Sequence, residues 1–64
     1  MYCNYVVLLY NNFRQLCSLV VYDKPITAIE EYNKLKQKYS GCNCKLELKY
    51  CNTNKIYTID EIIV

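Results

Sequence analysis

Five cysteines are the residues of this chain whose type and spacing could do chemistry. Cys42 and Cys44 stand two positions apart, Cys51 follows them, and Cys17 lies well before them. Thiolates are ligands that zinc prefers, and a structural zinc ion takes four ligands in a tetrahedron. The spacing therefore indicates a structural zinc ion held by Cys42 and Cys44, with Cys17 as the next ligand. The alternative is that the cysteines are reduced and fill small gaps in the core.

The arrangement of the strands decides which thiols can meet. If the chain from Cys44 to Cys51 is one extended strand, these two residues lie about 23 Å apart at ~3.3 Å per residue, too far to share an ion. If the third strand lies beside the second, Cys17 approaches Cys42 and Cys44. If the third strand lies beside the first instead, Cys3 becomes the neighbour of Cys51.

The sequence lacks the residues and motifs that enzymes commonly use for catalysis. The chain contains no His, so the common general base near neutral pH is missing. A single Gly does not allow a Gly-rich phosphate-binding loop, and no base is identified that would activate Cys17 or Cys44 as a nucleophile. We therefore expect a binding protein and not an enzyme.

Tyrosine is the second prominent residue type, with eight in the chain. Four are predicted to pack in the core, namely Tyr5, Tyr32, Tyr39 and Tyr50. Four are predicted to be partly exposed, namely Tyr2, Tyr10, Tyr22 and Tyr57. Because tyrosine is enriched in protein interfaces, a patch near Tyr10 and Tyr22 would bind a partner protein. Lys34 and Lys38 would steer an acidic partner toward the helix; the alternative is an ordinary solvated helix face.

Two strands are predicted in the first third of the chain. Residues 2–10 and 13–22 are rich in Tyr, Val and Leu, which is typical of buried strands. Asn11 and Asn12 between them predict a tight turn, because Asn tolerates positive φ. The segment therefore reads as a β-hairpin.

A helix and a third strand are predicted next. Residues 27–39 carry apolar side chains at helical spacing, and Thr27 with Glu30 fits a capping box at the helix start. Residues 42–50 alternate between apolar and polar side chains, as in a strand with one buried face.

The last segment completes the predicted fold. Residues 55–59 predict a short fourth strand, and residues 60–64 predict either its tail or a final helical turn. The order ββαββ predicts an α+β fold, in which one helix packs on one face of a four-stranded, mainly antiparallel sheet. The 64 residues allow one small domain over residues 1–64 and no linker.

Charge and the chain start bear on partner and location. The net charge of +2 is too small for a protein that coats nucleic acid and has the wrong sign for a DNA mimic. The start lacks a secretory signal, and the apolar run 5–10 is far shorter than the ~20 residues of a membrane helix. We expect a cytoplasmic protein without membrane contact. Its partner is expected to be a protein rather than nucleic acid, and the chain itself a monomer or weak dimer.

The size, the ββαββ pattern and the abundance of Asn, Lys, Tyr and Ile resemble the small accessory proteins of phages that infect low-GC Gram-positive bacteria. Within that class the chain is similar to the anti-CRISPR inhibitors of type II Cas9, some of which contain zinc. The segments that carry the resemblance are Cys3-Asn4-Tyr5-Val6-Val7, Ile29-Glu30-Glu31-Tyr32-Asn33-Lys34-Leu35 and Cys42-Asn43-Cys44. The resemblance implies a protein that binds Cas9 and blocks DNA loading or cleavage sterically. The charge of +2 departs from the acidic inhibitors that occupy DNA-binding sites.

Two other classes of function stay open from the sequence. One is a host-takeover or antitoxin-like protein that binds a different bacterial target. The other is a zinc-stabilised accessory module that contacts nucleic acid through the helix and through Lys45, Lys49 and Lys55. A phosphate-binding module loses affinity steeply as salt rises, so ionic strength separates it from the protein-binding classes.

Overall fold

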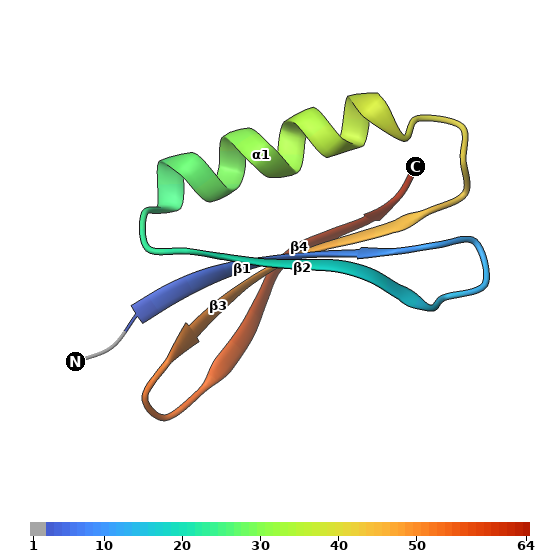
Figure 1. Cartoon of the computed structure of the whole chain (residues 1–64). Coiled ribbons are helices and arrows are strands. Elements are labelled where there is room, and N and C mark those ends of the chain that lie inside the picture. Colours follow the sequence, from blue (N-terminus) through green and yellow to red (C-terminus); the bar gives the residue numbers. More distant parts are fainter. Residues whose placement is uncertain (1–2) are drawn as a thin grey trace.

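The computed structural model describes residues 3–64, which form four strands and one helix (Figure 1). In chain order the elements are β1 (Cys3–Tyr10), β2 (Leu16–Tyr22), α1 (Pro25–Lys38), β3 (Lys45–Asn52) and β4 (Ile56–Ile63). The predicted α+β fold and its ββαββ order are confirmed. Tyr2, predicted to be partly exposed, lies outside the described residues.

The four strands form one antiparallel sheet in the order β2-β1-β3-β4. The third strand thus lies beside the first, which is the second of the two arrangements considered from the sequence. The helix carries the chain from β2 to β3 across β1, and it packs on β1, β2 and β3 without reaching β4. As a result, β2 and β4 are the edges of the sheet, and β1 and β3 are its centre.

The first hairpin has a longer connection than the predicted Asn11-Asn12 turn. The side-chain oxygen of Asn11 accepts hydrogen bonds from the backbone N–H groups of Phe13 and Gln15, at 2.8 and 3.0 Å. Arg14 adopts the left-handed region, with φ of 64°. This loop occupies Phe13 and its neighbours, so β2 begins at Leu16 instead of at Phe13. Side-chain capping of the local backbone is the reason that the turn extends.

The helix begins two residues before the predicted start. Its N-cap is Lys24, which makes no side-chain capping bond, and Pro25 occupies the first turn. Proline suits this position because its fixed φ is helical and its missing N–H would have no intrahelical partner. The predicted capping box is therefore wrong, since Thr27 already lies inside the helix.

The third and fourth strands also differ from their predicted limits. Cys42 and Asn43 belong to the turn before β3, and Asn43 has φ of 58°. The backbone of Val64 is tied to this turn: its N–H donates to Cys44 O and its C=O accepts from Asn43 N–H, both at 2.9 Å. This pairing keeps residues 60–64 extended. Of the two predicted alternatives, the tail of the strand is therefore found and the helical turn is not, and β4 continues to Ile63.

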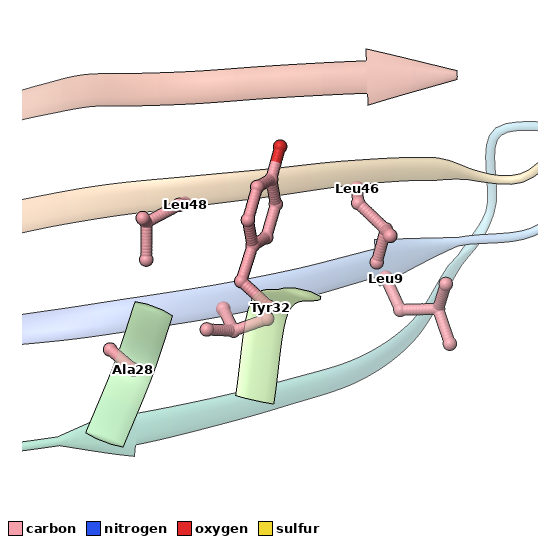
Figure 2. Packing of buried hydrophobic residues seen from close by; sticks show 6 residues of the cluster. Leu9, Ala28, Tyr32, Leu46 and Leu48 are labelled. Carbon is pink, nitrogen blue, oxygen red and sulfur yellow. The ribbon is translucent and has the colours of Figure 1, made fainter. Parts of the chain in front are cut away.

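The core lies between α1 and the two central strands (Figure 2). Alternate side chains of β1 and β3 point toward the helix and meet Ala28 and Tyr32; they are Val7, Leu9, Leu46 and Leu48. Ala28 and Leu46 have no exposed surface at all. Ala28 is small, which lets the helix backbone approach the sheet closely.

Tyr32 extends the core sideways. Its ring leans across β3, and its hydroxyl points toward β4 (Figure 2). The hydroxyl oxygen is buried without a hydrogen-bond partner. Burial raises the pKa of Tyr32, and the nearby Asp60 carboxylate adds to the rise. The aromatic ring thus extends from the helix across β3 toward β4, the strand that the helix does not contact. The buried polar atom without a partner costs stability.

We predict that Leu46→Ala lowers the free energy of unfolding by about 2–5 kcal/mol, because it opens a cavity in a fully buried site. Urea unfolding followed by circular dichroism measures this change. Ile56→Ala, at a side chain that is 67% exposed, is the control and should cost under about 1 kcal/mol. Equal losses for the two variants would contradict the described core.

We also predict that Tyr32→Phe raises the free energy of unfolding at neutral pH by about 1 kcal/mol, because it removes an unpaired buried hydroxyl. The raised pKa of Tyr32 means that its neutral form is favoured in the folded state. The stability that comes from this preference for the neutral form is fully present below the unfolded pKa of 10.0. It is lost as the pH rises above that value. The free energy of unfolding should therefore fall less steeply with rising pH for Tyr32→Phe than for the original chain. Tyr57→Phe, at an exposed ring, serves as the control.

Candidate functional site

The predicted zinc ligands are not gathered in the structure. Cys17 lies at the start of β2 and Cys42 in the turn before β3, with β1 between these two strands. The Cys17 thiol donates to the backbone oxygen of Gln15 at 3.5 Å, and the Cys44 thiol donates to that of Cys42 at 3.9 Å. Within residues 3–64 no three His, Cys, Asp or Glu side chains are grouped so that they could hold a metal ion. Among these residues the structure therefore gathers no ligand set for a structural zinc ion.

The thiols at the other end of the sheet are also separated. Cys3 is paired with Asn52, and Asn4 with Cys51, so neighbouring positions send the two thiols to opposite faces. The Cys3 sulfur accepts a hydrogen bond from the Tyr50 hydroxyl at 3.1 Å. This hydrogen bond is the first cause of the raised pKa of Tyr50.

The exposure of the cysteines also argues against the alternative that all of them fill small gaps in the core. Cys3, Cys17 and Cys42 are exposed, whereas Cys44 and Cys51 are half-buried. Only Cys44 packs against the described core cluster. Three of the five thiols thus face solvent in the single chain.

Tyr10 and Tyr22 do not form the predicted patch. Tyr10 is paired with Leu16 at one end of β1, and Tyr22 is paired with Tyr5 at the other end. Tyr22 packs against the core on the helix side, while Tyr10 belongs to the alternate set of side chains. Burial, followed by the charge of Glu47, raises the pKa of Tyr10. The two side chains therefore belong to different surfaces.

The predicted lysines lie on the exposed surface of α1. The Lys34 ammonium forms an ion pair with Glu31 at 3.3 Å. The Lys38 ammonium lies 5.4 Å from the centre of the Tyr39 ring. Both lysines therefore interact with their own helix and join neither Tyr10 nor Tyr22 in a common patch.

A row of four tyrosines crosses the sheet on its helix side, one from each strand. The register pairs Tyr22 with Tyr5, Tyr5 with Tyr50, and Tyr50 with Tyr57. The rings of Tyr5 and Tyr50 lie 5.1 Å apart, and those of Tyr50 and Tyr57 are stacked at 6.3 Å. Cross-strand aromatic pairs of this kind stabilise a sheet. The row thus accounts for half of the tyrosines as packing residues.

The opposite face of the sheet carries no helix and is partly apolar. The side chains that alternate with the core residues point to this uncovered face; on β1 and β2 they are Val6, Leu8, Leu19 and Val21. Leu19 and Val21 are each 52% exposed, although an antiparallel sheet face in water normally carries polar side chains. We call these four residues the apolar patch.

Charged side chains border the apolar patch on β3 and β4. Glu47 lies directly opposite Leu8 and is buried, with the ammonium groups of Lys45 and Lys49 at 3.4 and 4.0 Å from its carboxylate. Lys45 also approaches Glu61 of β4 at 3.9 Å. An apolar area with a polar border is the usual composition of a protein interface. This uncovered face is the candidate functional site.

The sequence contained a signal for this surface that the prediction missed. Leu19, Val20 and Val21 are consecutive apolar residues, so β2 carries apolar side chains on both of its faces. A strand that is buried on one face only should alternate with polar residues. The run therefore indicates a second buried face, which the single chain does not provide.

We predict that zinc does not protect Cys42 and Cys44 from a thiol reagent such as DTNB. In the native protein Cys3, Cys17 and Cys42 should react first because they are exposed. Mass spectrometry of partly labelled protein, with and without one equivalent of zinc, measures the order and the protection. Selective protection of Cys42 and Cys44 would show that the ligands assemble after all.

In the described residues α1 is neither long nor apolar enough to cross a membrane. Comparisons with protein-family models, with curated proteins and with solved structures found no match to this chain.

Proposed function

We propose that this chain is a protein-binding module that docks on its target through the uncovered face of the sheet. The observation that carries the proposal is the apolar patch, in which Leu19 and Val21 are half exposed although no helix or strand of the described chain covers them. Exposed contiguous apolar surface with a polar border marks sites of protein interaction. The work of such a module is to occupy a surface, not to transform a substrate.

The charges of the same face favour protein over nucleic acid. Lys45 and Lys49 both lie within 4.0 Å of the Glu47 carboxylate, and Lys45 also lies 3.9 Å from Glu61, so two carboxylates offset the two positive charges. A phosphate-binding surface needs a field of uncompensated basic groups. Two of the three lysines assigned from the sequence to nucleic acid are therefore engaged in ion pairs.

For the target we propose a bacterial defence protein, with type II CRISPR-Cas9 first. This choice rests on the resemblance to the phage anti-CRISPR inhibitors and on a net charge of +2, which suits neither DNA mimicry nor strong DNA binding. In this proposal the bound chain blocks DNA loading or cleavage sterically. The uncovered face supplies the contact, and the host bacterial cytoplasm is the compartment.

Val6→Glu tests the uncovered face. Val6 is half-buried on β1, directly opposite Lys49, so the new carboxylate gains a basic neighbour and the fold should persist. The charge in the middle of the apolar patch should weaken target binding at least about tenfold. Gln37→Glu, at an exposed position of α1, makes the same change of charge and should leave binding within about twofold.

The assay has two arms. Binding to purified Cas9 with guide RNA, and inhibition of its DNA cleavage, are measured for the original chain and both variants. Absence of binding by the original chain would refute Cas9 as the target. A capture from host lysate, compared with Val6→Glu, then tests the face against other bacterial proteins. Equal binding by the original chain and Val6→Glu, to any target, would refute the uncovered face as the contact surface.

A further inference from the structure

The edge strand β2 carries no charged residue along its whole length. Its sequence from Leu16 to Tyr22 is LCSLVVY, and Leu19, Val20 and Val21 are 52, 42 and 52% exposed. Among residues 3–64, β2 has β1 on one side and no strand on the other. A long, apolar, uncharged edge is a template for pairing with another strand, and soluble proteins usually protect such edges.

The other edge strand, β4, has features that protect it against pairing with a further strand. β4 carries two adjacent carboxylates, Asp60 and Glu61. Its pairing with β3 shifts register between Leu48 and Lys49, which leaves Ile59 as an extra residue. Charges and bulges of this kind disfavour edge-to-edge pairing. The irregularity of β2 is instead confined to its start, at Cys17, and Ser18 to Tyr22 pair regularly with β1.

We propose that two copies of this chain associate through β2, antiparallel about a two-fold axis, to form one eight-stranded sheet. The partner is a second copy because pairing of β2 with itself uses up both β2 edges and leaves only the protected β4 edges free. Pairing of β2 with β4 of another copy would leave a free β2 edge at every step and grow a filament. Self-pairing of β2 brings no charge against another in any register. Self-pairing of β4 would gather the carboxylates of Asp60 and Glu61 from both copies, and like charges opposite each other destabilise a sheet.

The exposed side chains of β2 gain cover in this dimer. In an antiparallel pair, residues directly opposite each other lie on the same face of the sheet. Val20, which is paired with Val7 and so lies on the helix side, would meet the corresponding part of the partner strand there. Leu19 and Val21 would likewise contact the partner's β2 on the uncovered face. The two apolar patches would thereby become continuous across the axis, with both helices on the other side.

Sedimentation equilibrium of two lysine variants tests the dimer. Val20→Lys puts an ammonium group of each copy on the helix side of the β2–β2 contact and leaves the uncovered face unchanged. This variant should give the monomer mass with an unchanged circular dichroism spectrum. Ile59→Lys, at a 51% exposed position of β4, is the matched control and should keep the dimer mass of the original chain. A monomeric original chain, or loss of the dimer in Ile59→Lys but not in Val20→Lys, would overturn the proposal.

Hydrogen exchange of the unmodified chain gives a second test that does not depend on any variant folding. The amides of β2 should exchange more slowly as the protein concentration rises, because the outward N–H groups become paired. The amides of β4 should show no such dependence. Protection that grows with concentration in β4, or in neither edge, would refute pairing through β2.

Discussion

The structure depends on one constraint, which is that a single helix must cover a sheet wider than itself. Four strands at about 4.8 Å spacing make a sheet roughly 19 Å wide, whereas a helix with its side chains is about 10 Å across. The 14 residues of α1 therefore cover part of one face. The buried residues of the sheet concentrate on β1 and β3, and every residue of β4 is exposed.

Several features follow from this shortage of cover. Tyr32 reaches farther than an aliphatic side chain could, and its ring shields β3 at the cost of a buried hydroxyl without a partner. The tyrosine row performs a similar task at the end of the sheet, where stacked rings cover one another. On the uncovered face, Glu47 and its two lysines form a layer of aliphatic stems and paired charges over β3. The apolar patch on β1 and β2 has no such layer, which is why binding is expected there.

The local patterns of the sequence were sufficient for the element types but not for their arrangement. Helical spacing identified Ala28 and Tyr32 as core residues, and alternation placed Leu46 and Leu48 on the buried face of β3. The position of β3 beside β1 is set by tertiary packing, and the spacing of apolar residues along the chain does not reveal it. The choice of Cys17 as the next zinc ligand depended on this arrangement, because Cys17 approaches Cys42 and Cys44 only if β3 lies beside β2. The sequence left open whether residues 60–64 extend the fourth strand, because the backbone hydrogen bonds of Val64 to the turn before β3 decide this.

The central position of β1 affects how the chain reaches its native state. Tyr10 pairs with Lys45 and Cys3 with Asn52, so the β1–β3 ladder joins residues that are 35 to 49 positions apart. Long-range pairing slows folding, and a ribosome releases the N-terminal half first. During synthesis the β1–β2 hairpin must therefore wait, with the core side chains of β1 still in water, until β3 emerges. In that interval the exposed apolar side chains and unpaired strand edges are the kind of surface through which incompletely folded chains aggregate.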